Sequence, residues 1–209
     1  AEKVPKTMEI HGDTRVDDYY WMKLSDEQKE SETPDTATQK VVAYLEAENG
    51  YTEKMMEHLA PFQDKLFEEI KGRIKETDMS VPYKDNGYFY ITRYEEGQEY
   101  PIYSRKKGNL EADEEIMLNV NELAKAYDYF NVAGRSVSGN TAILGYGEDN
   151  VSRRIYRIYF NNLKTGEMLS DEMPNTTGGV FWANDNKTVF YYQKDDALSS
   201  YKIFRHTLG

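Results

Sequence analysis

Residues 138–144 read Ser-Gly-Asn-Thr-Ala-Ile-Leu, and residues 184–190, about 46 positions later, read Asn-Asp-Asn-Lys-Thr-Val-Phe. Each stretch joins a polar turn to a short run of β-forming side chains. A second pair keeps nearly the same offset: residues 156–159 read Tyr-Arg-Ile-Tyr, and residues 201–204 read Tyr-Lys-Ile-Phe. This period is typical of four-stranded propeller blades, although a meandering sheet without a propeller would produce the same pattern.

Further β-type runs surround the repeat, and most of the 18 tyrosines, which suit half-buried strand surfaces, follow Tyr83. At roughly 45 residues per blade, residues 82–209 provide between two and three blades, whereas closed propellers need at least four. We therefore expect a truncated propeller whose open strand edges favour a partner chain or self-association. The β-type runs are residues 88–91, 101–104, 116–118, 142–144, 156–160 and 189–192.

Residues 1–81 have a different pattern, which predicts an extended segment followed by a two-helix arm. Thr36 and Gln39 fit a capping box at the start of the first helix, and Pro61 fits the start of the second, with Gly72 as a break. Apolar side chains recur at helical spacing in both helices, so the pattern predicts an antiparallel arm whose apolar stripes need a partner surface. The stripes are Val41, Leu45, Met55 and Leu59 in the first helix, and Phe62, Leu66, Ile70 and Ile74 in the second.

Composition excludes several kinds of partner and chemistry. The net charge of −11 argues against nucleic acid, which needs a basic face. That charge is compatible with a cationic substrate or with a role in solubility alone. The chain contains no cysteine, so disulfides and thiolate chemistry are excluded. No apolar run approaches the roughly 20 residues of a membrane span, and we expect no membrane partner.

The sequence contains no convincing catalytic, cofactor or metal residues. The nearest approach to a Gly-x-Ser-x-Gly nucleophile turn, residues 134–138, lacks the last glycine and lies among strands. His11 is expected to have a structural hydrogen-bonding role, His58 to favour a helix C-terminus, and His206 has no assigned role. The acidic clusters at 68–69 and 111–115 lack the ligand spacing of a calcium loop and are interpreted as solvated faces.

Residues 11–21, His-Gly-Asp-Thr-Arg-Val-Asp-Asp-Tyr-Tyr-Trp, resemble the N-terminal signature of the prolyl oligopeptidase family. The His-Gly-Asp start and the Tyr-Tyr-Trp end favour its oligopeptidase B branch. The resemblance extends from about Val4 to the end of the chain, and its specificity comes from the order of the motifs. These motifs lie at residues 44–49, 69–74, 86–88, 99–103, 148–154 and 182–185.

The resemblance implies a function as well as a fold. Members of this family are serine peptidases, cytosolic or periplasmic, that cleave short peptides after Lys or Arg. They join a seven-bladed propeller to a C-terminal α/β-hydrolase domain that carries the Ser-Asp-His triad, and the propeller restricts substrate size. This chain is expected to be the N-terminal, non-catalytic part of such an enzyme, inactive without the hydrolase domain and cytoplasmic or, alternatively, periplasmic. The competing interpretation is a β-propeller-like interaction module with no peptidase parent.

The resemblance also places one pair of charged residues. Asp128 and Arg154 fall on the side of the propeller that faces the hydrolase domain in this family. An arginine can form a bidentate ion pair there that holds a closed state and can open. The alternative is an ordinary salt bridge within one blade, which contributes little if it is exposed.

Overall fold

Residues 83–119 form a four-stranded antiparallel sheet in the computed structural model, which describes all residues 1–209. At its first turn, Asn86 and Gly87 have φ values of 44° and 81°. A two-residue turn with two positive φ angles matches the twist of the strands that it joins. The strands lie in chain order and are β3 (Tyr83–Asp85), β4 (Tyr88–Arg93), β5 (Ile102–Lys107) and β6 (Glu114–Asn119), followed by the short helix α4 (Val120–Ala124).

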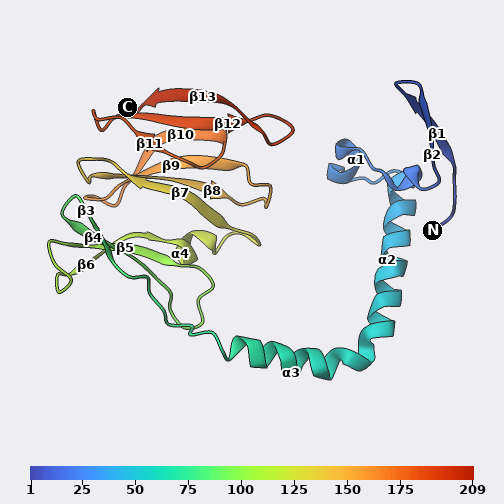
Figure 1. Cartoon of the computed structure of the whole chain (residues 1–209), viewed down its shortest axis with the longest axis horizontal. Coiled ribbons are helices and arrows are strands. Elements are labelled where there is room, and N and C mark those ends of the chain that lie inside the picture. The colour runs from blue at the N-terminus through green and yellow to red at the C-terminus, as the bar shows by residue number, and fades with distance from the viewer. The chain divides into compact units, whose positions relative to one another are not determined.

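The remaining seven strands form one hydrogen-bonded sheet, which divides into a group of four strands and a group of three. A single ladder pair, Thr176 with Gln193, joins these two groups, which therefore correspond to adjacent blades. The predicted partial propeller of two to three blades is confirmed (Figure 1). The second blade contains β7 (Asn131–Val137), β8 (Ile143–Asp149), β9 (Tyr156–Asn162) and β10 (Met168–Thr176), and the third contains β11 (Phe181–Trp182), β12 (Thr188–Lys194) and β13 (Ser200–Thr207).

The sequence repeat corresponds to equivalent strands of successive blades. Residues 138–144 lead into β8 and residues 184–190 into β12, which are the second strands of their blades. Residues 156–159 and 201–204 lie in β9 and β13, the third strands. The repeat of about 46 residues therefore measures the distance along the chain from one blade to the next.

The core lies in the seams between blades. One buried cluster joins the first and second blades, and its least exposed members are Val120 of α4 and Leu144 and Tyr146 of β8. The other joins the second and third blades around Ile158, Phe160 and Val189. Because each blade contributes side chains to a neighbour, no blade completes its core alone.

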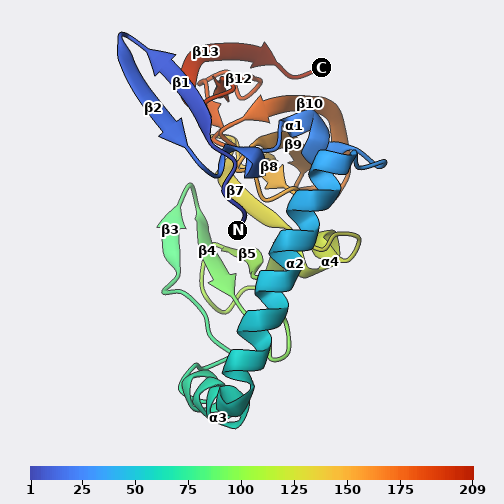
Figure 2. The same ribbon diagram turned by 90° about the vertical axis from the view of Figure 1, so that its right-hand side faces the viewer.

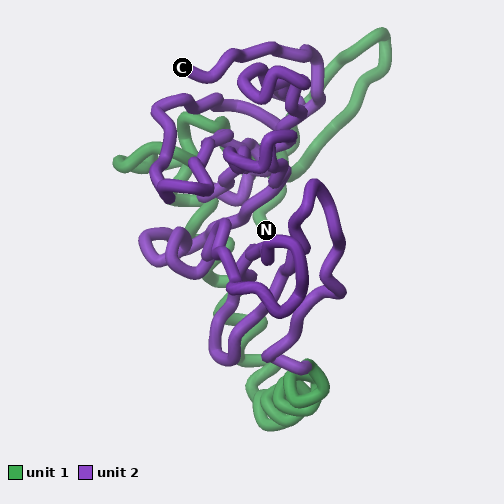
Figure 3. The backbone as a smooth tube through the Cα atoms, turned by 90° about the vertical axis from the view of Figure 1, so that its left-hand side faces the viewer, with its two compact units in different colours: residues 1–74 green, residues 75–209 purple.

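The chain divides into two compact units, residues 1–74 and 75–209 (Figure 3). Residues 75–81 run beside β4, where the amide of Ser80 donates to the Thr92 carbonyl at 2.8 Å and Tyr94 donates to Asp78 at 2.8 Å. The sequence pattern predicts a domain boundary between residues 81 and 82. That boundary stays a prediction, because it concerns units that fold independently, whereas the two compact units are defined by contacts.

The first unit begins with a hairpin of β1 (Lys6–Ile10) and β2 (Asp13–Asp17). His11 lies in the turn of this hairpin at φ 56°, and the hydrogen-bonding role expected for it stays a prediction. The structural role of His11 is conformational, because it adopts a left-handed backbone before Gly12. After the hairpin come η1 (Tyr20–Met22) and α1 (Asp26–Glu30), and Trp21 of η1 packs edge-on against Tyr44.

The helical arm contains α2 (Thr36–Met56), the single turn η2 (Glu57–Leu59) and α3 (Ala60–Lys71). The predicted capping box at Thr36 is wrong by one residue, because Asp35 is the N-cap and accepts from the Thr38 amide at 2.7 Å. Gln39 donates to the Pro34 carbonyl instead of reaching the cap. The predicted end of the second helix at Gly72 is confirmed. None of the helices combines the length and apolar character needed to cross a membrane.

The two arm helices do not lie antiparallel as predicted. They meet at η2 and leave it in different directions, so that α3 is seen almost end-on when α2 stands upright (Figure 2). With only η2 between them, the helices have no loop long enough to reverse the chain. Val41 is buried, whereas Leu45 and Met55 are exposed, as are the α3 side chains Phe62 and Ile70. The apolar stripes therefore have no partner within the first unit.

We expect Asp35→Ala to lower the helix content of the chain and to reduce its melting temperature by about 2 to 4 °C, because the Thr38 amide loses its acceptor. Thr36→Ala is the matched control, since Thr36 is not the cap, and it should change neither quantity. Far-ultraviolet circular dichroism during heating measures both variants. Equal effects of the two substitutions would contradict the assignment of Asp35 as the cap.

Candidate functional site

The first two blades share one end, at which β6 passes through α4 to β7, and we call it the α4 end. Asn131 begins β7 and pairs with Asp149, the last residue of β8, so the β8–β9 loop lies at this end as well. The loop between β4 and β5 also lies here, because Ile102 at the start of β5 pairs with Asn119 at the end of β6. Three connections therefore meet at the α4 end.

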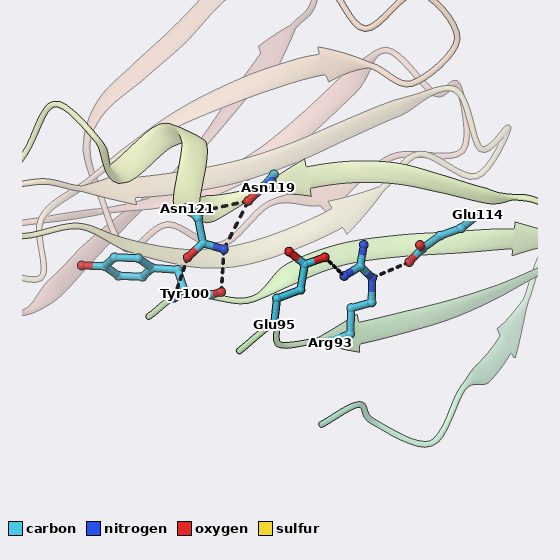
Figure 4. A network of polar contacts seen from close by, with 6 residues as sticks. All are labelled: Arg93, Glu95, Tyr100, Glu114, Asn119 and Asn121. Carbon is cyan, nitrogen blue, oxygen red and sulfur yellow. Dashed lines mark hydrogen bonds and ion pairs between the residues drawn. The ribbon is translucent and has the colours of Figure 1, made fainter. Parts of the chain in front are cut away.

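Two groups of polar contacts fix the β4–β5 loop (Figure 4). Asn121 accepts from the Tyr100 amide and donates to the Tyr100 carbonyl, both at 2.8 Å. The Arg93 guanidinium contacts Glu114 at 2.8 Å and Glu95 at 2.5 Å. The hydrogen bonds to these carboxylates raise the pKa of Arg93. The β4–β5 loop is thus held both to α4, through Asn121, and to β6, through Glu114.

Buried Asp149 shapes the β8–β9 loop. Its carboxylate accepts from the amide of Val151 at 3.0 Å and from the amide of Arg154 at 2.7 Å. Ser152 and Arg154 both have positive φ values, 63° and 56°, which non-glycine residues adopt at an energetic cost. The Arg154 carbonyl also accepts from Lys194 of β12. The sequence alone did not identify this anchor, because Asp149 resembles an ordinary strand-end acid.

The structure places Asp128 and Arg154 at the same α4 end of the second blade. Asp128 lies in the bend between α4 and β7, and Arg154 ends the loop that Asp149 anchors. Both side chains are exposed, and no ion pair joins them or links either to another residue of the chain. The interdomain role stays a prediction.

A pocket of about 270 Å³ lies beside this loop, between the exposed ends of β9 and β10. Glu148 lines it together with Tyr159 and Asn175. Burial raises the pKa of Glu148, and a hydrogen bond with Tyr146 acts in the opposite direction without cancelling the effect. The carboxylate of Glu148 forms no ion pair.

Glu148→Gln is expected to stabilise the chain at neutral pH. Because the pKa of Glu148 is raised in the fold, the folded state binds the proton more tightly than the unfolded state does. The contribution of Glu148 to the free energy of unfolding therefore decreases as pH rises through the folded pKa. Removing the charge removes this loss. Urea denaturation at pH 5 and pH 7 should show a smaller difference for the variant than for the original chain. An unchanged difference would show that Glu148 titrates as it does in the unfolded state.

The remaining sequence candidates have structural roles. Residues 134–137 lie in β7 and Ser138 follows it, and the Ser136 carbonyl accepts from the Trp182 indole at 3.1 Å. His58 lies in η2, just beyond the end of α2. His206 of β13 contacts Asp171 of β10 at 2.6 Å and so links two blades. Within the acidic cluster at 111–115, Glu115 pairs with buried Arg105, while its own side chain is 44% exposed, in keeping with the interpretation as a solvated face.

The repeated antiparallel sheets, the seams between them and the helical arm define a propeller-type domain. The model of the family described as the prolyl oligopeptidase N-terminal β-propeller domain matches residues 1–209, and this chain belongs to that family. The resemblance seen in the sequence is thereby confirmed.

Relatives and solved structures support the same assignment. The chain is 38% identical to dipeptidyl aminopeptidase BI of Pseudoxanthomonas mexicana over 95% of its own length and 28% of that protein. It is 33% identical to protease 2 of Moraxella lacunata, covering 100% of this chain and 30% of the relative. Oligopeptidase B from Leishmania major matches with a TM-score of 0.86 at 28% identity, over 100% of this chain and 30% of that one. The chain thus spans less than a third of the length of these proteins.

Proposed function

We propose that this chain supplies the N-terminal arm and the first propeller blades of a serine oligopeptidase that cleaves short peptides after Lys or Arg. The observation that carries the proposal is the match along the whole chain to oligopeptidase B from Leishmania major. In the parent protein these blades restrict substrate size, and the catalytic α/β-hydrolase domain is their partner. The chain alone contains no Gly-x-Ser-x-Gly turn and is expected to be inactive.

Exposed apolar side chains support a further partner surface in the parent protein. Phe62, Phe67 and Ile70 of α3 are 62%, 62% and 53% exposed. Soluble proteins rarely leave a helix with such a stripe uncovered. We propose that the arm packs on the hydrolase domain.

The name of one relative favours a second candidate activity. A dipeptidyl aminopeptidase removes dipeptides from a free N-terminus, and the Pseudoxanthomonas protein carries that name at 38% identity. The two activities are distinguished with a matched pair of fluorogenic Arg substrates, one with an acetylated N-terminus and one with a free amine. We expect the full-length product of the reading frame to cleave both. Cleavage of the free-amine substrate alone would overturn the oligopeptidase proposal in favour of dipeptide release.

The pair Asp128 and Arg154 is proposed to hold the closed state of the parent protein. A related structure, oligopeptidase B from Trypanosoma brucei, is described as a closed form with covalently bound antipain, and it matches this chain with a TM-score of 0.84. Asp128 and Arg154 are free of ion pairs within this chain, so each has its charge available to another domain.

Asp128→Asn and Arg154→Gln are each expected to lower kcat/KM of the full-length product by about three- to tenfold, the effect of losing an ion pair that contributes up to about 1.4 kcal/mol. High salt should reduce the difference from the original protein. Arg153→Gln, which removes a neighbouring exposed charge, is the control and should have no effect. If all three variants behave alike, the loss is one of general charge and the interdomain pair is wrong.

A further inference from the structure

A β-bulge in β7 changes the direction of one arginine. Ala133 pairs with Gly147 and Ser136 with Gly145, so Gly134 and Arg135 together oppose a single residue of β8. Gly134 adopts a φ of 62°, which suits a glycine at the first position of such a bulge. Bulges of this kind redirect the following side chain. The bulge within residues 134–138, the segment that resembles an incomplete nucleophile turn in the sequence, therefore sets the direction of the Arg135 side chain.

The Arg135 side chain is directed to the first blade. Its guanidinium carbon lies 3.6 Å from the centre of the Tyr103 ring of β5. This contact occupies one face of the guanidinium and is accompanied by a side-chain hydrogen bond to Tyr103, while the planar fork has further N–H donors. Arg135 is exposed and forms no ion pair with any carboxylate of the chain. A strand arginine held by an aromatic ring, with no carboxylate partner in the chain, is well placed to bind an anion.

Arg135 lines a pocket of about 260 Å³ between the first and second blades. Tyr83 and Tyr90 form another part of the wall, with their rings stacked at 5.2 Å between centroids. Burial raises the pKa values of these two hydroxyls, so both stay protonated and can donate hydrogen bonds. Asp85 also lines the pocket and adds a negative charge to it. It forms no ion pair with Arg135. The pocket thus combines one cation, one anion and flat aromatic walls.

We propose that this pocket binds the free carboxyl terminus of a short peptide. The guanidinium edge of Arg135 takes the carboxylate in a bidentate contact, and the tyrosine rings flank the last side chain of the peptide. Asp85 disfavours a second negative charge, so a peptide that ends in an acidic residue binds less well. The proposal concerns the propeller alone and holds whether or not the parent protein is a peptidase.

The probe is acetyl-Gly-Phe with a free carboxyl terminus, compared with the same peptide as its amide. Binding to the full-length product of the reading frame is measured by isothermal titration calorimetry. We expect the amide to bind about tenfold more weakly, and Arg135→Gln to weaken the acid by the same factor while leaving the amide unchanged. Asp85→Asn should tighten binding of the acid about threefold, an effect of opposite sign.

Controls separate this result from a general effect of charge or folding. Arg153→Gln removes an exposed cation outside the pocket and should leave the affinity for the acid unchanged. Arg135→Lys keeps the charge without the planar fork and should give an intermediate affinity, which also covers the case in which the glutamine variant fails to fold. Equal binding of acid and amide, or full affinity in Arg135→Gln, would overturn the proposal. Competition by acetate as strong as by the peptide acid would also overturn it, since the site would then recognise any carboxylate.

Discussion

Gly134→Ala is expected to lower the free energy of unfolding of the chain by about 2 to 5 kcal/mol. An alanine Cβ at this position would lie 1.7 Å from the carbonyl oxygen of Gly178, a contact that no rotation of a side chain can relieve. Residue 134 also has a φ of 62°, which adds the cost of a left-handed backbone. Because Gly178 leads into the third blade, the backbone of β7 must move away from that blade.

Gly166→Ala is the matched control for this prediction. Gly166 has a φ of 74°, but a Cβ there would meet no atom within 4 Å. This substitution should cost about 1 to 2 kcal/mol, the effect of the backbone conformation alone. Urea denaturation followed by tyrosine fluorescence measures both. Equal losses for the two variants would show that the close approach of Gly134 to Gly178 does not constrain the fold.

Arg105→Met is expected to destabilise the chain by about 2 to 3 kcal/mol. The Arg105 side chain is 3% exposed, contacts Glu115 at 2.8 Å and donates to the Thr141 carbonyl at 2.8 Å. Thr141 precedes β8, so this hydrogen bond links the first blade to the second. Methionine preserves much of the side-chain volume, but it leaves the Glu115 carboxylate and the Thr141 carbonyl without their hydrogen-bond donor.

An exposed arginine of the same blades provides the comparison. Arg157 contacts Glu172 at 2.7 Å, with both side chains 48% exposed. Arg157→Met should therefore cost less than about 1 kcal/mol, as exposed ion pairs usually do. The same denaturation experiment, repeated in high salt, should leave the effect of Arg105→Met nearly unchanged. A loss at Arg105 no greater than at Arg157 would show that the buried guanidinium does not join the blades.

Much of the propeller was predictable because its blades repeat in the sequence. The turns and β-forming runs at 138–144 and 184–190 depend on local preferences, and these correspond to equivalent strands. The helix cap was misplaced because Asp35 and Thr36 are both good capping residues and are adjacent. The relative direction of α2 and α3 could not be read from periodicity, which gives the apolar face of each helix but not the geometry of the turn η2.

The candidate site was less predictable than the fold. Asp128 and Arg154 came from resemblance, and the strand pairing shows only that they share one end of a blade. Arg135 gave no signal, because its direction depends on a bulge, and the glycine requirement at 134 depends on a contact with Gly178, far along the chain. Long-range contacts of this kind leave no trace in a single sequence.

The most direct test of the account is hydrolysis of a fluorogenic, N-blocked dipeptide ending in Arg, compared between this chain and the full-length product of its reading frame. We expect hydrolysis by the longer protein, its loss after covalent modification of a serine, and no hydrolysis by this chain. Absence of activity in both proteins would contradict the peptidase parent and favour an interaction module. Hydrolysis by this chain alone would contradict its non-catalytic role.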